Sequence, residues 1–154
     1  MGSEPKPALL VSACLLGVEC NHRGGASPSA MVRALEDRYR LVPICPEVAG
    51  GLPTPRPAAE RQGDGRVRTQ SGDDVTEFYL RGAAAAVDLA RGVGAVGAVL
   101  KARSPSCGSS EVYDGTFSRT LVAGVGVTAA ALRATGLEVR SDEDLEAESG
   151  SPDS

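Results

Sequence analysis

The chain has 154 residues, which fits one domain with its own hydrophobic core. Its formal net charge of −4 argues against binding to nucleic acid, which requires a positive surface. No apolar run approaches the roughly 18 residues of a membrane-spanning helix, and the first residues lack the pattern of a secretory signal. We therefore expect a cytoplasmic protein with neither nucleic-acid nor membrane partners. In that reducing compartment its four cysteines are more typical of metal ligands or reactive thiols than of disulfides.

Short apolar runs alternate along the chain with segments of helical periodicity, which predicts strands separated by helices. In chain order we expect a strand at residues 8–13, a helix at 29–37, a strand at 39–44, a helix at 74–91, a strand at 95–100, a helix at 127–135 and a strand at 137–140. Residues 74–77 resemble a capping box at the start of the second helix. The buried face of that helix is predicted to include Phe78 and Gly82.

Strands that alternate with helices predict a parallel sheet joined by crossover helices. The continuous apolar runs agree, because parallel strands are buried on both faces. We therefore expect one α/β domain over residues 8–147, with an open, mostly parallel sheet flanked by helices in a Rossmann-like, three-layer arrangement. Residues 1–7 are expected to form a flexible N-terminus and residues 148–154 a disordered tail. The sequence leaves open whether the protein is a monomer or a homodimer.

The segment from residue 46 to residue 72 has no sustained periodicity and carries four prolines between residues 46 and 57. Prolines favour a stiff, extended path over disorder, and a loop of this length inside a compact domain usually carries function. Because the segment directly follows a predicted strand, it leaves from the carboxyl edge of the sheet and could cover a site there. Residues 66–70 are predicted to form a short edge strand.

Three cysteines follow predicted strands. Cys14 comes directly after the first strand, Cys45 directly after the second, and Cys107 lies in the loop after the third. In a parallel sheet these positions all lie at the carboxyl edge, where open α/β folds bind ligands. We therefore expect the three thiols to meet, although each could alternatively be a small buried hydrophobic residue. Cys20 lies mid-loop and could be a fourth ligand, a neighbouring thiol or inert.

The kind of centre is indicated by the thiol spacing. Structural zinc sites favour four ligands in paired Cys-x-x-Cys spacing, and the sequence has no such pair. Thiolates also hold iron–sulfur clusters, and a cubane on three cysteines leaves one iron free to act as a Lewis acid. A structural zinc or iron site and a non-catalytic cluster carrier or sensor stay open as alternatives. Cysteine hydrolase chemistry would need His22, but a lone loop histidine is more often solvated than catalytic.

Five blocks of the sequence are distinctive. They are VSACLLGVEC at residues 11–20, CPEVAGGLPTPR at 45–56, GDDVTE at 72–77, LKARSPSCG at 100–108 and YDGTF at 113–117. Together these blocks resemble a bacterial family typified by thiouracil desulfidase. They occur in the order of the family, and the resemblance extends over residues 8–145. The chain departs from the family after Cys20, where an aromatic residue and an Asp are usual and NHRGG stands here at residues 21–25.

The resemblance implies a 4Fe–4S cluster bound by Cys14, Cys45 and Cys107, with the fourth iron free of protein ligands. It also implies a non-redox desulfidase. In such an enzyme the open iron takes the sulfur of a small thiolated compound, such as a thiopyrimidine, and water supplies the replacing oxygen. Glu47 would be the acid/base carboxylate, and Ser104 would orient substrate or water.

Four polar residues of these blocks also have structural interpretations. Glu47 beside a cluster could shuttle protons, or it could cap a backbone turn. Ser104 could be an ordinary turn residue before a proline. Arg56 could bind an anion or be a solvated loop charge, and Lys101 could assist the site or merely end its strand.

Overall fold

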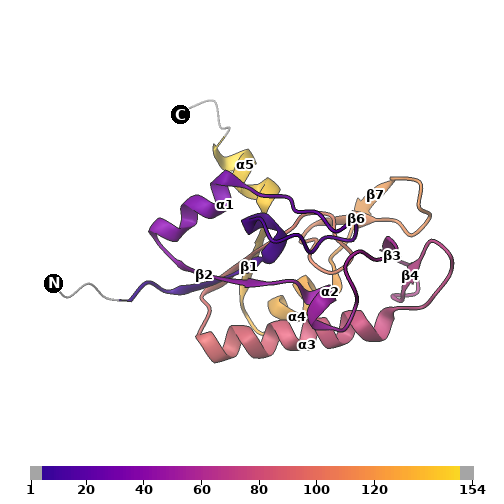
Figure 1. Ribbon diagram of the computed structural model, residues 1–154, viewed down its shortest axis with the longest axis horizontal. Helices are drawn as coiled ribbons and strands as arrows, with labels where there is room; N and C mark the ends of the chain where they lie inside the picture. Colours follow the sequence, from indigo (N-terminus) through magenta and orange to yellow (C-terminus); the bar gives the residue numbers. More distant parts are fainter. Residues whose placement is uncertain (1–4, 150–154) are drawn as a thin grey trace.

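A sheet of four parallel strands forms the centre of the molecule (Figure 1), in a computed structural model that describes residues 5–149. The strands are β1 (Ala8–Ser12), β2 (Arg40–Ile44), β5 (Gly97–Leu100) and β8 (Glu138–Ser141). Their order in the sheet is β2-β1-β5-β8, and Leu10 of β1 is in register with Val42 on one side and Ala98 on the other. The parallel α/β sheet predicted from the sequence is thus confirmed, with strand limits that differ by at most two residues.

Helices cover both faces of this sheet (Figure 1). Helices α1 (Ala30–Ala34) and α5 (Asp142–Ser149) lie on one face, and α3 (Thr76–Val93) and α4 (Val127–Ala134) lie on the other. Successive strand residues point to opposite faces, so Leu10 packs in the cluster beneath α3 and α4, whereas Leu9 and Val11 pack in the cluster on the α1 side. The predicted three-layer arrangement follows from this alternation. The helix predicted at residues 29–37 is α1 followed by a 3-10 turn, η2 (Leu35–Asp37).

Helix α3 lies close to the sheet because its inner face is built mostly from small residues. Its buried residues are Tyr79, Gly82, Ala83, Ala86 and Ala90. Tyr79 takes the inner position that the sequence had assigned to Phe78, which is only half-buried. The predicted capping box is also absent: the cap position is Val75, and the Asp74 carboxylate instead accepts hydrogen bonds from the backbone N–H and the hydroxyl of Thr76.

The proline-rich segment contains secondary structure that its irregular pattern did not predict. A short helix, α2 (Pro46–Ala49), begins with a proline, which is well tolerated in the first helical turn. The segment then forms an antiparallel hairpin of β3 (Ala59–Arg61) and β4 (Val67–Thr69). The strand predicted at residues 66–70 therefore exists, but it pairs with β3 and not with the edge of the central sheet.

A second hairpin, β6 (Glu111–Tyr113) with β7 (Leu121–Ala123), lies beside the first at the same end of the molecule (Figure 1). The two are joined by Glu60, whose carboxylate accepts hydrogen bonds from the backbone N–H groups of Gly115 and Phe117 at 3.0 and 3.1 Å. Together the hairpins extend beyond the carboxyl edge of the sheet, the region that the proline-rich segment was expected to cover.

The two ends of the domain are partly held in place. The Pro7 carbonyl accepts a hydrogen bond from Arg40, and Lys6 donates to the carbonyl of Glu36. Helix α5 extends to Ser149 and so includes the first two residues of the predicted tail. Residues 1–4 and 150–154, which complete the segments predicted to be flexible, lie outside the described residues. Within residues 5–149, no helix has the length and apolar character needed to cross a bilayer.

Candidate metal centre

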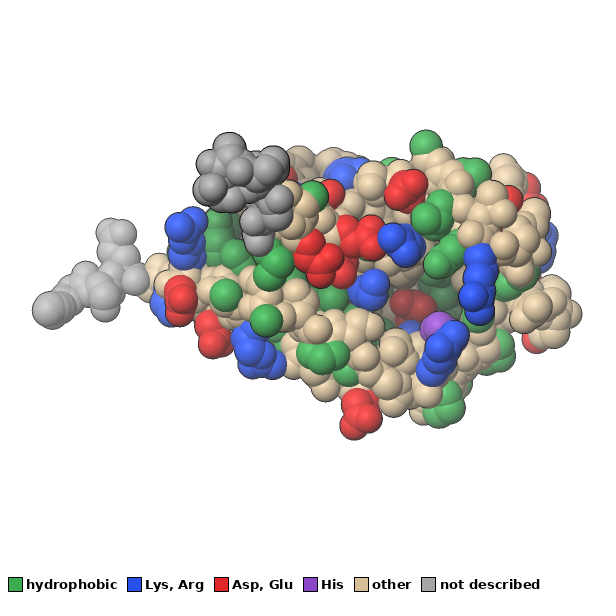
Figure 2. Space-filling view, turned by 90° about the horizontal axis from the view of Figure 1, so that it is seen from above, with side chains coloured by type: hydrophobic (Ala, Val, Ile, Leu, Met, Phe, Trp, Pro, Cys, Tyr) green, Lys and Arg blue, Asp and Glu red, His purple; other side chains and the backbone are tan. Residues whose placement is uncertain are grey.

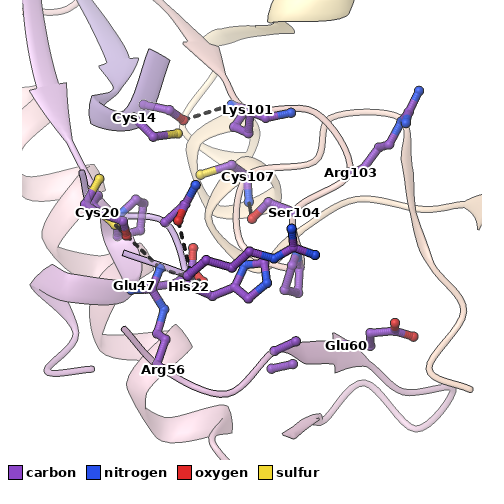
Figure 3. A pocket seen from close by; sticks show the side chains of 18 of the residues that line it. Cys14, Cys20, His22, Glu47, Arg56, Glu60, Lys101, Arg103, Ser104 and Cys107 are labelled. Atoms are coloured by element: carbon purple, nitrogen blue, oxygen red, sulfur yellow. Dashed lines mark hydrogen bonds and ion pairs between the residues drawn. The ribbon is translucent and has the colours of Figure 1, made fainter. Parts of the chain in front are cut away.

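A pocket of about 590 Å³ opens at the carboxyl edge of the sheet, between the sheet and the two hairpins. Its lining includes all four cysteines, Cys14, Cys20, Cys45 and Cys107. Figure 3 shows Cys14 and Cys107 extending toward the same space, with Glu47 and Arg56 on its other side. The structure thus brings together the thiols that the strand order predicted would meet; their function as ligands stays a prediction.

The backbone places each of the three predicted ligands directly. Cys14 lies in a 3-10 turn, η1 (Ala13–Leu16), that continues from β1, and Cys45 is the residue between β2 and α2. The Cys107 loop is pressed against the start of α4. A Cβ atom at Gly126 would lie 2.5 Å from the carbonyl oxygen of Ser106, which is far too close for any side chain. This loop therefore requires glycine beside it to bring Cys107 to the pocket.

All four cysteines are free thiols; Cys14, Cys20 and Cys107 are buried, and Cys45 is half-buried. Burial, and next the nearby Cys45, raise the pKa of Cys14 to about 11. Burial also raises the pKa of Cys107 to about 12, with Glu47 as the next cause. Without a metal these side chains stay protonated at neutral pH. Because metal binding requires thiolates, loading this site would release protons.

Cys20 differs from the other three, since it comes from the middle of the first loop. Its pKa is raised to about 12. Burial is the largest cause, followed by the charge of Cys45 and then by a hydrogen bond with Cys45. The Cys45 Sγ lies 3.7 Å from the Cys20 carbonyl oxygen. Of the three interpretations left open for Cys20, a thiol neighbouring Cys45 fits this arrangement best.

Glu47 reaches the pocket from the first turn of α2. Its carboxylate oxygen Oε2 accepts a hydrogen bond from the Tyr79 hydroxyl at 3.0 Å and lies 3.3 Å from Arg56 Nη2. Helix α2 comes this close to α3 because of Gly82, where an added Cβ would lie 2.0 Å from the Pro46 carbonyl oxygen. The glycine that allows two backbones to touch therefore also determines where the carboxylate lies.

Arg56 is buried, with only 4% of its side chain exposed, which excludes the solvated loop charge. Its guanidinium donates to the carbonyl oxygens of Cys20 and Pro53 and to the Thr54 hydroxyl, in addition to its ion pair with Glu47. Its backbone N–H donates to the His22 carbonyl. Arg56 thereby ties the first loop, the proline-rich segment and α2 to one another.

Ser104 and Lys101 line the pocket from the third cysteine loop. The Ser104 hydroxyl oxygen accepts from the backbone N–H groups of Ser106 and Cys107, both at 3.0 Å. It therefore shapes the turn that carries Cys107, while its own proton is left for another acceptor. The Lys101 ammonium nitrogen lies 3.9 Å from Asp142 Oδ2. The charge of Lys101 lowers the pKa of Cys14, which opposes the larger effect of burial.

Basic side chains outnumber acidic ones in the pocket lining, in contrast to the negative net charge of the whole chain. Figure 2 shows Lys and Arg side chains gathered around a hollow on this face. The basic lining residues are Arg23, Arg56, Lys101, Arg103 and Arg119, against the acidic Glu47 and Glu60. His22 also lines the pocket, where burial and then the charge of Arg23 lower its pKa. A neutral imidazole among cations leaves the pocket suited to an electron-rich ligand.

Among the lining residues that the sequence reasoning missed, Tyr79 and Ser12 contact predicted site residues directly. Tyr79 was missed because a tyrosine on a helix carries no signal of its own; its spacing of three residues from Gly82 could have placed it on the inner face. Ser12 ends β1, accepts a hydrogen bond from the Lys101 backbone N–H at 2.8 Å and hydrogen-bonds Cys107, which lowers the pKa of that thiol against the larger effect of burial. A serine at the end of an apolar strand was its only signal.

The arrangement of donors indicates the size of the centre it could hold. Across residues 5–149, no three His, Cys, Asp or Glu side chains are grouped tightly enough to bind one metal ion. The three thiols nevertheless share one pocket, where Cys45 contributes to the raised pKa of Cys14 and Cys14 contributes to the raised pKa of Cys107. Soft sulfur donors spread around a common space suit a multinuclear iron–sulfur centre better than a single zinc ion.

Comparison with known families decides the relationship. The model of the 2-thiouracil desulfurase family matches residues 9–144. The chain belongs to this family. The resemblance seen in the five sequence blocks is thereby confirmed.

Two individual relatives support the assignment. The chain is 42% identical over 146 residues to a protein of Bacillus subtilis (strain 168) named YbbK and described as uncharacterized, covering 89% of this chain and 97% of that protein. It is 46% identical to a solved structure described as the [4Fe-4S]-dependent thiouracil desulfidase TudS, with a TM-score of 0.85 over 92% of this chain and 95% of the other. The second comparison also confirms the predicted fold.

Proposed function

We propose that this member of the 2-thiouracil desulfurase family is a 4Fe–4S-dependent desulfidase that replaces the sulfur of a small thiolated compound, such as a thiopyrimidine, with oxygen. The observation that carries the proposal is the gathering of Cys14, Cys45 and Cys107 with a half-buried, hydrogen-bonded carboxylate, Glu47, in one pocket. The solved relative described as a [4Fe-4S]-dependent thiouracil desulfidase supports both the cofactor and the reaction.

The residues present fit an iron–sulfur cluster. Cys14, Cys45 and Cys107 would hold it, because they are free thiols that follow three strands of one sheet and share one pocket. When bound on three thiolates, such a cluster supplies one iron without a protein ligand, which acts as a Lewis acid toward the substrate sulfur. Cys20 would stay a neutral thiol beside Cys45.

The overall reaction consumes one water and releases one hydrogen sulfide. A carbon–oxygen bond forms and the carbon–sulfur bond breaks, with no net transfer of electrons to or from the protein. Glu47 takes a proton from water as the water oxygen bonds to the carbon, and this proton then leaves with the sulfur. The second proton of that water also ends on the sulfide, which balances the conversion of C=S and H₂O to C=O and H₂S.

Ser104 would assist by orientation. Because its oxygen already accepts two backbone hydrogen bonds, the hydroxyl proton is directed away from the turn and is available to the substrate or the attacking water. The basic lining would attract an electron-rich thiolated ring and help to hold it.

The proposal is tested by anaerobic reconstitution with iron and sulfide, followed by assay of sulfide release from 2-thiouracil and related thiobases. We expect broad visible thiolate-to-iron absorption and sulfide release. Tightly bound zinc without that absorption would contradict the cofactor, and a loaded protein inactive toward all thiobases would contradict the reaction.

The variant Glu47→Gln separates an enzyme from a cluster carrier. We expect the cluster to be retained and turnover to fall by about 10²- to 10⁴-fold, the usual contribution of general acid–base catalysis. Unchanged turnover would remove Glu47 from the mechanism.

A further inference from the structure

We propose that Tyr79 and Arg56 are positioning residues that hold Glu47 by a single carboxylate oxygen, Oε2, so that the other oxygen, Oε1, is presented to the substrate and water. This inference rests on the proposed function and adds to it two residues outside the predicted catalytic set. It begins from the observation that both contacts to Glu47 meet on the same atom, the Tyr79 hydroxyl at 3.0 Å and Arg56 Nη2 at 3.3 Å.

The second oxygen of Glu47 is open to the pocket. Among residues 5–149, the one buried side-chain nitrogen or oxygen that lacks a hydrogen-bond partner is Arg56 Nε. Oε1 of Glu47 receives neither of the two contacts above. If this oxygen were buried, it would be a second buried atom without a partner, and Arg56 Nε is the one such atom among the described residues. Oε1 is therefore exposed to solvent in the pocket. The side chain is 14% exposed, which is consistent with one accessible oxygen on an otherwise covered carboxylate.

Tyr79 is a fixed and permanent donor. It is 2% exposed and lies on the inner face of α3, three residues before the glycine against which α2 packs. Burial, and next the charge of Glu47, raise the pKa of its hydroxyl far above neutral. The phenol therefore stays protonated and always donates to the carboxylate.

Arg56 is fixed from three directions. Its guanidinium is shared between Glu47, the Cys20 carbonyl at 3.0 Å and the Pro53 carbonyl at 3.2 Å, so it cannot swing into the pocket without leaving these acceptors unpaired. The same contacts relate the position of Glu47 to the loop that carries Cys20. Arg56, which the sequence suggested could bind an anion, therefore already contacts the protein's own carboxylate and carbonyl groups.

Holding one oxygen sets the direction of the other. A carboxylate anchored through Oε2 can rotate only about that contact, which limits Oε1 to a narrow region of the pocket. General base catalysis depends on such placement, and a displacement of about 1 Å can cost about 100-fold in rate. Loss of the Tyr79 hydroxyl should therefore reduce kcat more than it changes KM.

The test is Tyr79→Phe, which keeps the ring and removes only the hydroxyl, with Tyr39→Phe as the matched control. Tyr39 packs against the other core cluster, on the α1 side of the sheet. We expect Tyr79→Phe to load the cluster with unchanged absorption, to lower kcat by about 10- to 100-fold and to leave KM within about twofold, and Tyr39→Phe to match wild type. An unchanged kcat, a higher KM alone, or a lost cluster would each overturn the positioning role.

A second readout does not depend on turnover. Crystal structures of the wild type and of Tyr79→Phe without cluster should show the Glu47 carboxylate displaced in the variant, with the backbone of α2 in place. An unmoved carboxylate overturns the proposal even if the wild-type protein has no desulfidase activity. In that case the proposed function fails separately, on the thiobase assay.

Arg56→Lys gives the corresponding test of the second donor. Lysine keeps the charge but cannot contact Glu47 and the loop carbonyls together. We expect kcat to fall with the cluster retained and Glu47 displaced in the crystal structure. If Arg56→Lys does not fold, the Tyr79→Phe variant alone tests the positioning of Glu47. A folded Arg56→Lys variant with wild-type kcat would exclude Arg56 from positioning.

Discussion

On one side of the pocket three thiols are placed by the backbone, whereas on the other side one carboxylate is held by side chains from two further segments. Cys14, Cys45 and Cys107 each follow a strand of one sheet, so their positions are determined once the strands pair. Glu47 instead depends on Tyr79 from α3 and on Arg56 from the proline-rich segment.

The two sides should consequently fail in different ways. A substitution on the thiol side removes a donor and leaves the fold, because the sheet does not need the sulfur. A substitution on the carboxylate side alters geometry while every thiol stays present. Cluster content and turnover are therefore separable measurements, and together they distinguish the two sides.

The largest effect is expected from removing single thiols. Cys14→Ala, Cys45→Ala and Cys107→Ala should each abolish stable cluster binding and activity, because two thiolates would be left for a centre that needs three. Cys20→Ala is the matched control and should keep the cluster. Iron and sulfide content after anaerobic reconstitution measures this, and loss of iron in Cys20→Ala would instead indicate four ligands.

A smaller but still large effect is expected where α2 meets α3. Gly82→Ala would place a Cβ 2.0 Å from the Pro46 carbonyl oxygen, so we expect a loss of about 1–3 kcal/mol in unfolding free energy from overpacking, together with reduced turnover.

The control for this variant lies on the same helix. Gly92→Ala meets no atom within 4 Å and should be neutral or stabilising by up to about 1 kcal/mol, because alanine favours helix over glycine. Urea unfolding of both apoproteins provides the comparison, and equal stability changes would show that the close contact does not constrain α2.

An intermediate effect is expected at Ser104. Ser104→Ala removes the acceptor for two backbone N–H groups and should destabilise the Cys107 turn by about 0.5–1.5 kcal/mol for each hydrogen bond, with lower kcat. Ser104→Thr keeps the hydroxyl and should restore most of both. Thermal unfolding and steady-state kinetics measure these two quantities. If the threonine variant behaves like the alanine variant, the hydroxyl is not the group that matters.

The smallest effect concerns the pH dependence of the reduced apoprotein. Burial raises the pKa of Cys14 to about 11 and of Cys107 to about 12 from the ordinary 9.0, so above pH 9.0 the folded chain retains protons that the unfolded chain releases. This contribution to stability is complete below pH 9.0 and is lost as pH rises toward about 12. The unfolding temperature should therefore fall between pH 9.0 and about 12, and it should fall less steeply in Cys107→Ala than in the wild type. Identical profiles of unfolding temperature against pH in the two proteins would contradict the raised pKa of Cys107.

Much of the architecture could be predicted because it depends on patterns within short stretches of chain. Apolar runs specified the four strands, their alternation with helices specified a parallel sheet, and the parallel sheet brought Cys14, Cys45 and Cys107 to one edge. These are consequences of periodicity and connectivity, which a sequence carries directly. The family resemblance added Glu47 and Ser104, both of which line the pocket.

What the tertiary structure alone decided is how the carboxylate is held. The pattern of residues 46–72 did not reveal α2 or the β3–β4 hairpin, because short elements stabilised by contacts with other segments have little periodicity of their own. Nor could it reveal that Tyr79 and Arg56 meet on one oxygen of Glu47, since Tyr79 and Glu47 lie 32 positions apart in the sequence. Strand pairing follows from local sequence, whereas side-chain contacts between distant segments exist only once the chain has packed.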